Sequence, residues 1–200
     1  VITNGYDVEK IVRPPLDEQF TVAHIGSLLS GRNPLNLWES LAELRREEPG
    51  FTDAFSLKLV GAVSPDVLHT IQESGLEDCL DLKGYLPHEA AVQAQRSSQV
   101  LLLIEIDAPE TRSIIPGKLF EYMVSERPIL ALGPDGSDFA ALLTETNTGR
   151  FFRYDEKEAI KEQLLQYFRE YQQGKLQSFP VGLQRYSRKS LTGQLAQLLR

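Results

Sequence analysis

Short apolar segments alternate with longer amphipathic segments along most of the chain. Residues 100–104 are apolar at every position, which is typical of a strand buried on both faces of a parallel sheet. Leu37, Leu41 and Leu44 have the spacing of one helix face. The same criteria predict strands at 20–25, 55–60, 80–82, 100–104, 129–132 and 149–152, and helices at 34–48, from 64, 87–96, 116–125, 137–144, 155–172 and 182–199. This alternation predicts an α/β fold with a mostly parallel sheet, and residues 173–180 are expected to form a loose connector.

Chain length, net charge and cysteine content restrict the kinds of function that the sequence allows. The 200 residues suit one globular domain or one half of a two-domain enzyme. The net charge of −7 disfavours broad binding to a nucleic-acid backbone, so no nucleic-acid partner is expected. A single cysteine, Cys79, cannot form an internal disulfide and fits a cytoplasmic protein. The chain begins with Val1 and holds one methionine, Met123, so it is expected to be a piece of a longer protein.

Glycines follow four of the predicted strands. They are Gly26, Gly61, Gly84 and Gly133. Ligands of open parallel sheets bind outside the carboxyl ends of the strands, and glycine lets the backbone approach a ligand closely. The pattern favours a binding cleft at this edge over a set of ordinary turns.

The segment after the fourth predicted strand has the chemistry of an anion site. A polar loop, 105–113, leads to Pro116, Gly117 and Lys118. Gly117 leaves neighbouring backbone N–H groups uncovered at a helix start, and Lys118 adds a positive charge. A plain helix start with a solvated lysine remains an equal alternative at this stage.

Other site chemistries fit the sequence less well. The phosphate-binding loop pattern fails because Leu119 follows Lys118, and the dinucleotide pattern fails because Leu28 occupies the place of its middle glycine. The three histidines, His24, His69 and His88, lack metal-ligand spacing. No metal and no cofactor are therefore expected.

Residues 115–123 (Ile-Pro-Gly-Lys-Leu-Phe-Glu-Tyr-Met) and 126–130 (Glu-Arg-Pro-Ile-Leu) resemble the signature of bacterial glycosyltransferases of the GT-B fold, those grouped with the sucrose-synthase-like family. Weaker similarities to the same family occur, in the family's order along the chain, at 3–7, 24–27, 31–34, 59–61, 84–89, 186–188 and 191–192. The resemblance implies a Rossmann-like three-layer domain that forms the C-terminal half of a GT-B fold. Residues 1–18 would then be interdomain linker or the start of the domain, residues 19–200 the nucleotide-sugar donor-binding domain, and the N-terminal acceptor domain would be absent.

The resemblance also assigns phosphate-binding residues. Gly117 and Lys118 match the helix start that faces the donor diphosphate, and Gly26 matches the glycine whose backbone approaches the same phosphates. Arg32 lies near the basic residue of the family's glycine loop. Lys118 and Arg32 are thus expected to be catalytic, because they would stabilise the leaving diphosphate without a metal.

Further matches concern the nucleoside and the sugar. Glu121 matches the second glutamate of the family's paired-glutamate motif, which bonds the ribose hydroxyls, and Tyr85 and Leu86 match the strand end beside the base. The first glutamate of the pair is replaced by Ser113, and Glu110 stands three residues away. This departure leaves the sugar contacts and the stereochemical outcome open.

The function implied is the donor half of a glycosyltransferase of bacterial surface polysaccharide or glycan synthesis. It would be inactive alone, cytoplasmic, and placed at the inner face of the membrane through peripheral association of the missing domain. Two alternatives remain. One is a nucleotide-sugar epimerase, for which His88 beside Glu89 is the adjacent histidine–carboxylate pair. The other is a non-catalytic α/β interaction domain.

Overall fold

Six parallel strands form one sheet at the centre of the protein. The computed structural model describes residues 3–7 and 14–198. The strands are β1 (Phe20–Ile25), β2 (Phe55–Val60), β3 (Leu80–Gly84), β4 (Val100–Ile104), β5 (Ile129–Leu132) and β6 (Gly149–Phe152). Their spatial order is β3-β2-β1-β4-β5-β6, and every neighbouring pair is parallel. The predicted strands are confirmed, and only β3 is longer than expected.

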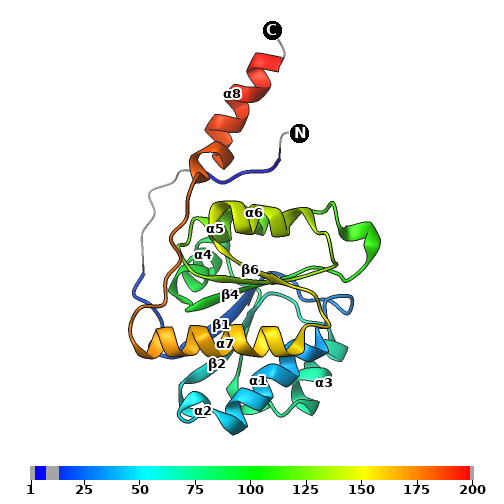
Figure 1. The fold of residues 1–200 in the computed structure, drawn as a ribbon, viewed down its shortest axis with the longest axis vertical. Helices are drawn as coiled ribbons and strands as arrows, with labels where there is room; N and C mark the ends of the chain where they lie inside the picture. The colour runs from blue at the N-terminus through cyan, green and yellow to red at the C-terminus, as the bar shows by residue number, and fades with distance from the viewer. Residues whose placement is uncertain (1–2, 8–13, 199–200) are drawn as a thin grey trace.

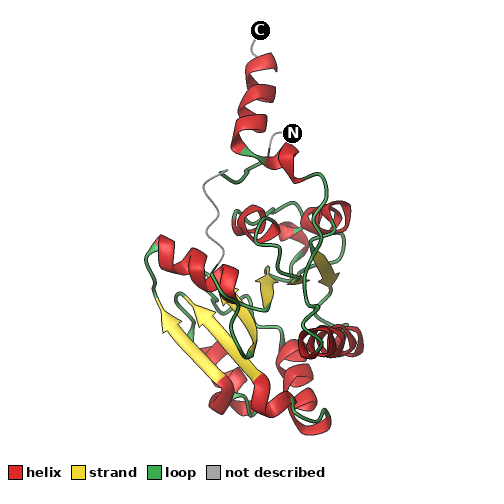
Figure 2. Cartoon of the chain, turned by 90° about the vertical axis from the view of Figure 1, so that its left-hand side faces the viewer, coloured by secondary structure: helices red, strands yellow, loops and turns green. Residues whose placement is uncertain are grey.

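Helices cover both faces of the sheet (Figures 1 and 2). The α-helices are α1 (Leu35–Glu47), α2 (Phe51–Ala54), α3 (Pro65–Glu73), α4 (His88–Ser97), α5 (Lys118–Met123), α6 (Asp138–Thr146), α7 (Lys157–Gln172) and α8 (Arg188–Leu198). Short 3-10 helices lie at η1 (Glu77–Cys79), η2 (Pro109–Thr111) and η3 (Leu183–Tyr186). Helices α1, α3 and α7 share one apolar core with the sheet, and α5 and α6 share the other. The expected three-layer α/β architecture is therefore present.

Strand β4 explains why two cores form. Val100, Leu102 and Ile104 belong to the core under α1 and α7, whereas Leu101 and Leu103 belong to the core under α5 and α6. Successive side chains of a strand point to opposite faces, so an uninterrupted apolar strand is buried on both. In the strand order β4 lies beside β1 at the centre of the sheet, so its carboxyl end is near the middle of one edge.

The C-terminal third departs from the sequence expectations. The connector 173–180 lacks helix and strand but is not loose, because buried Arg127 donates a hydrogen bond to the carbonyl oxygen of Leu176 at 2.8 Å. The helix expected at 182–199 is divided into η3 and α8, and its last residue lies outside the described residues. Helix α8 stands away from the sheet beside residues 3–7 (Figure 1), where Tyr6 bridges Ser187.

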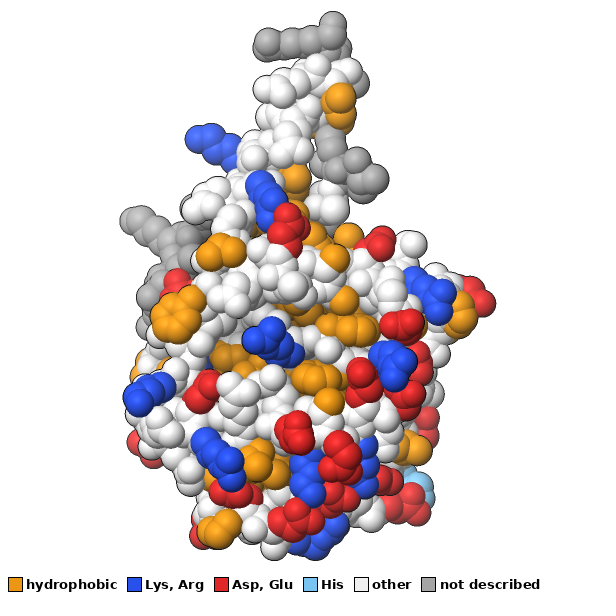
Figure 3. Space-filling view, in the orientation of Figure 1, with side chains coloured by type: hydrophobic (Ala, Val, Ile, Leu, Met, Phe, Trp, Pro, Cys, Tyr) orange, Lys and Arg blue, Asp and Glu red, His pale blue; other side chains and the backbone are white. Residues whose placement is uncertain are grey.

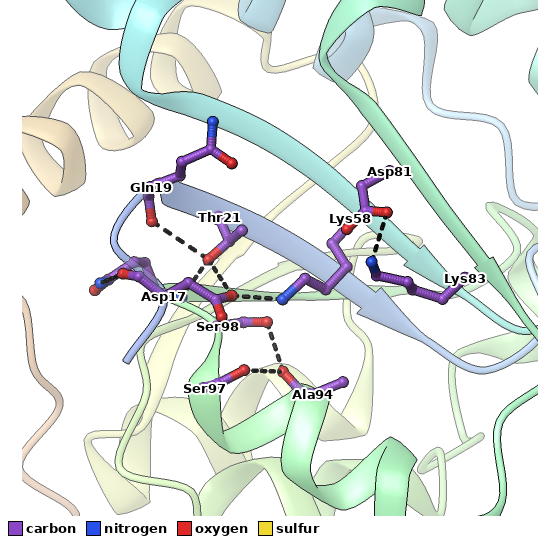
Figure 4. Close-up of polar contacts among 10 residues, drawn as sticks. Asp17, Gln19, Thr21, Lys58, Asp81, Lys83, Ala94, Ser97 and Ser98 are labelled. Carbon is purple, nitrogen blue, oxygen red and sulfur yellow. Dashed lines mark hydrogen bonds and ion pairs between the residues drawn. The ribbon is translucent and has the colours of Figure 1, made fainter. Parts of the chain in front are cut away.

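A polar network ties the segment before β1 to the sheet (Figure 4). Asp17 forms an ion pair with Lys58 of β2 and accepts a hydrogen bond from Thr21 of β1 at 2.8 Å. The Asp17 N–H also donates to the carbonyl oxygen of Ser97 at 2.8 Å. Part of the expected linker thus packs on the domain. The boundary at residue 18 stays a prediction, and residues 1–2 and 8–13 of that linker lie outside the described residues.

Charged side chains of both signs gather over α1 and α7 (Figure 3). Lys161 forms ion pairs of 2.7 Å with Glu43 and with Glu47, and Lys157 pairs with Glu39 and Glu43. Within the described ranges, no helix combines the length and the apolar character required to cross a membrane.

Candidate functional site

Two glycines bring backbone segments into close approach where β1 and β2 end. Gly26 and Gly61 have φ angles of 112° and 113°, a region that side chains rarely allow. A Cβ atom on Gly61 would lie 2.7 Å from the carbonyl group of Gly26. A Cβ atom on Gly26 would lie 2.9 Å from Nζ of Lys118. Glycine at these positions therefore leaves the ammonium group directly beside the backbone after β1.

Lys118 reaches this point from the first residue of α5. Its Nζ lies 3.2 Å from Nε2 of His24 on β1. Burial, reinforced by repulsion from Arg32, lowers the pKa of Lys118 to about 8, while the nearby carboxylate of Glu105 opposes the shift. The group is therefore a cation at neutral pH that is poorly hydrated, and it would gain from an anionic partner.

His24 is fully buried under this lysine. Its Nδ1 lies 3.1 Å from the carbonyl oxygen of Leu102 on β4. Because a carbonyl oxygen only accepts hydrogen bonds, Nδ1 carries the proton and Nε2 accepts from Lys118. Burial first, and the Lys118 charge second, lower the pKa of His24 to about 3, although the carbonyl groups of Ser27 and Leu102 favour the charged form. The imidazole is neutral at physiological pH.

Arg32 and Glu105 form a second charged pair at the same edge. An Nη atom of Arg32 lies 2.8 Å from Oε1 of Glu105, whose side chain is 3% exposed. Glu105 directly follows β4, and Tyr154 donates a hydrogen bond to its carbonyl oxygen at 2.7 Å. The carboxylate fixes the direction of Arg32. With Lys118 included, this group of three side chains holds two cations and one anion and is net positive.

Glu121 lies one turn further along α5. It lines a cavity of about 170 Å³ together with Tyr6, His88 and Gln95, among others. The next residue, Tyr122, fixes the helix to β1, because its hydroxyl accepts from the N–H of Ile25 at 2.9 Å. From the sequence, Leu119, Phe120, Met123 and Val124 were expected to form the core face of this helix. The first three are buried, whereas Val124 is only half-buried and lines the same cavity as Glu121. Glu121 is consequently free to point away from the core.

The start of α5 differs from the expectation in two respects. The helix begins at Lys118, two residues after Pro116, and it ends at Met123. A Cβ on Gly117 would lie 3.2 Å from the side-chain amide nitrogen of Asn4, so Asn4 lies against the helix start that was expected to be uncovered. Six residues give a weak macrodipole, and the positive side chains are therefore the main attraction for an anion.

The remaining expected residues are more scattered. Tyr85 is 89% exposed, and it follows β3, two strands away from β1. Leu86 follows it and is half-buried. Ser113 and Glu110 are both exposed in the segment between β4 and α5. The structure thus brings Gly26, Lys118 and Arg32 together, with Glu121 on the same helix as Lys118.

A second cavity of about 530 Å³ lies beside the loops that follow β4, β5 and β6. Its lining includes Arg112, Arg153 and Tyr154. Among the residues that the structure describes, no group of three or more His, Cys, Asp or Glu side chains is placed to hold a metal ion.

No protein-family profile matches the sequence significantly, and no curated protein does so either. Solved structures do match. Anabaena HepE in complex with UDP is 17% identical, with a TM-score of 0.67 over 91% of this chain and 49% of HepE. Sucrose-phosphate synthase from Thermosynechococcus elongatus is 18% identical, with a TM-score of 0.72 over 100% of this chain and 51% of that one. This chain has the fold of one half of a GT-B glycosyltransferase.

A third structure, WaaG, carries the description of a glycosyltransferase involved in lipopolysaccharide biosynthesis. It is 17% identical, with a TM-score of 0.61 over 80% of this chain and 40% of WaaG. The chain therefore spans about half the length, or less, of these GT-B enzymes. At this level of identity the likeness establishes the fold.

Three residues of the site were not expected from the sequence. His24 was noted as lacking metal-ligand spacing and as part of the segment 24–27 that resembles the family, but neither it nor Glu105 nor Tyr122 was assigned a role. One signal was present: Glu105 is a charged residue directly after a fully apolar strand, where parallel strands place ligand-facing groups.

Proposed function

We propose that this chain is the donor-binding half of a glycosyltransferase that transfers a sugar from a nucleotide-diphosphate sugar to an acceptor. The observation that carries the proposal is the position of the Lys118 ammonium beside Gly26, with Arg32 close by, at the carboxyl edge of a GT-B half. A diphosphate brings the negative charge that the poorly hydrated Lys118 ammonium lacks.

The same arrangement suits the chemistry of transfer. The nucleoside diphosphate is the leaving group, so negative charge grows on its phosphate oxygens as the bond to the sugar breaks. Lys118 and Arg32 would stabilise that charge, and the backbone at Gly26 would approach the phosphates. Preorganised charges of this kind each lower a barrier by about 3 kcal/mol. Arg32 is held ready by Glu105 before any ligand arrives.

Glu121 and the end of β3 would hold the nucleoside. A carboxylate can accept hydrogen bonds from both ribose hydroxyls, and Glu121 borders a cavity of about 170 Å³. Tyr85 and Leu86 would lie beside the base. HepE was crystallised with UDP, which makes UDP the first nucleotide to test.

The proposal also covers the acceptor, the biosynthetic role and the cellular location. The acceptor and a general base would come from a second, N-terminal domain, and this chain would not transfer sugar by itself. We place the enzyme in bacterial surface polysaccharide or glycan synthesis, in the cytoplasm and at the inner membrane face through peripheral association of the second domain. The description of WaaG supports the first of these placements.

A ligand screen tests the proposal. The chain is titrated calorimetrically with uridine, guanosine, thymidine and adenosine diphosphates, with and without EDTA. We expect one diphosphate to bind, with the same affinity when divalent metal is removed. Failure of all four to bind would contradict the proposal and favour a non-catalytic interaction domain. Binding that EDTA abolishes would contradict the metal-independent site.

A further inference from the structure

His24 is a fully buried polar side chain to which the mechanism above gives no task. Both nitrogen atoms of its ring form hydrogen bonds. Its Nδ1 meets the carbonyl oxygen of Leu102 at 3.1 Å, and its Nε2 meets Nζ of Lys118 at 3.2 Å. The ring therefore connects the backbone of β4 to the cation that faces the ligand.

We propose that His24 is a positioning residue, whose neutral imidazole accepts a hydrogen bond from Lys118 and holds the ammonium group beside Gly26. This inference rests on the proposed function, because it assigns His24 to the diphosphate site described above.

The physical need for such a residue lies in the lysine side chain. A lysine has four flexible methylene groups, and holding them in one arrangement costs rotamer entropy. The Leu102 carbonyl is fixed in the sheet, so the imidazole bonded to it is fixed as well. The ring uses one of the three ammonium N–H donors and leaves the other two for phosphate oxygens.

Other charged groups near Lys118 do not replace this contact. Arg32, on the segment after β1, repels the ammonium, and Glu105, after β4, attracts it. Glu105 is already bonded to Arg32 at 2.8 Å. A neutral acceptor can orient Lys118 without cancelling the positive charge that a diphosphate would meet, whereas a second carboxylate would weaken that attraction.

Two substitutions separate the two hydrogen bonds of the ring. In His24→Asn, the amide nitrogen can still donate to Leu102, but the acceptor for Lys118 is lost. In His24→Gln, the amide oxygen reaches the place of Nε2, so the acceptor is kept. We expect His24→Asn to weaken binding of the preferred nucleoside diphosphate about tenfold, as for loss of a hydrogen bond to a charged group, and His24→Gln to restore most of the affinity.

The unliganded protein gives an independent readout. Nitrogen-15 NMR of the unchanged protein should show a neutral His24 with the proton on Nδ1 between pH 5 and pH 8. NMR titration of the Lys118 side chain should show a lower pKa in His24→Asn than in His24→Gln, because the ammonium loses its acceptor. Melting temperatures of both variants verify that they fold.

The outcomes are distinguishable. A proton on Nε2, or equal effects of the two variants on the Lys118 titration and on affinity, would overturn the role of His24. Absence of nucleoside-diphosphate binding by the unchanged protein would instead contradict the proposed function, while the NMR result would still decide the His24–Lys118 hydrogen bond.

Discussion

Burial of the Lys118 ammonium lowers the stability of the folded protein, and the same charge is available to bind an anion. Its ammonium is largely buried with another cation nearby, and this environment lowers its pKa to about 8. Lys118→Met keeps a flexible apolar side chain and removes the buried charge. We expect the variant to melt at a higher temperature and to bind nucleoside diphosphate at least about tenfold more weakly. Thermal unfolding and calorimetry measure the two effects, and Lys175→Met, at an exposed loop lysine, should change neither.

Folding stability and affinity for a nucleoside diphosphate should depend on pH with opposite signs. Because the folded pKa of Lys118 lies below its ordinary value of 10.5, the unfolded chain binds more protons between about pH 8 and pH 10.5. The contribution of Lys118 to folding stability therefore rises with pH in this window. Affinity for a diphosphate should fall over the same window as the cation is lost. Urea unfolding and calorimetry across pH 7–10 measure both, and a flat affinity profile would contradict the charged role of Lys118.

Glu121 should matter for binding and little for folding. If its carboxylate accepts both ribose hydroxyls, Glu121→Ala loses bonds worth about 1.5–3 kcal/mol each, so affinity should fall at least about tenfold. As a glutamate in the first turn of α5, it contributes only about 0.3–1 kcal/mol to helix stability. Glu158→Ala, in the first turn of α7, is the matched control. An unchanged affinity in Glu121→Ala would eliminate the ribose role.

The sequence predicted part of this site at the level of residues. Gly26, Lys118 and Arg32 were expected at one position, and the structure places them near one another. Their function remains a prediction. His24 and Glu105 could not be assigned, because their partners, Lys118 and Arg32, are distant in the sequence. Such pairs depend on strand order, which periodicity does not specify.

At the level of elements, apolar pattern was the reliable signal. The strands were predicted well because each must be buried in the sheet, and β4 is apolar at every position. Helix ends were predicted less well. Helix α5 is shorter than expected at both ends. It begins at Lys118, which like Tyr122 contacts β1, although Pro116 suits a first helical position. The connector 173–180 was misjudged because Arg127, which holds it, lies far away in the sequence.

The ion pairs between α1 and α7 should contribute modestly to stability. Hydrogen bonds from Lys157 and Lys161 hold the pKa of Glu43 at about 2, below its ordinary value of 4.5. The contribution of Glu43 is therefore present above pH 4.5 and is lost as the pH falls toward 2. We expect Glu43→Gln to destabilise the protein by less than about 1 kcal/mol at pH 7, because the pairs are solvent-screened.

Urea unfolding at pH 7 and pH 2.5 measures this effect. The destabilisation should shrink at low pH and in 1 M salt, where the Debye length is about 3 Å. Glu158→Gln, outside the cluster, is the control. A loss in Glu43→Gln that is independent of both pH and salt would show that packing, and not charge, joins the two helices.

For the whole molecule, the arrangement of the sheet places the candidate residues at one edge. The strand order β3-β2-β1-β4-β5-β6 puts β1 beside β4 at the centre, so the segments after these two strands, with Gly26, Arg32 and Glu105, face one another. In doubly wound sheets, ligands bind outside the carboxyl ends of the strands at the topological switch point, where the strand order reverses. Strand–helix alternation predicted the fold class, whereas the strand order became known only from the structure.

Amide hydrogen exchange with and without the preferred nucleoside diphosphate tests the central claim most directly. The account predicts slower exchange at residues 26–28 and 117–121, with a smaller effect at residues 85–86, and no such protection in Lys118→Met. Protection confined to the loops around Arg112 and Arg153, or to α1 and α7, would contradict the claim that the donor binds beside Gly26, Lys118 and Glu121.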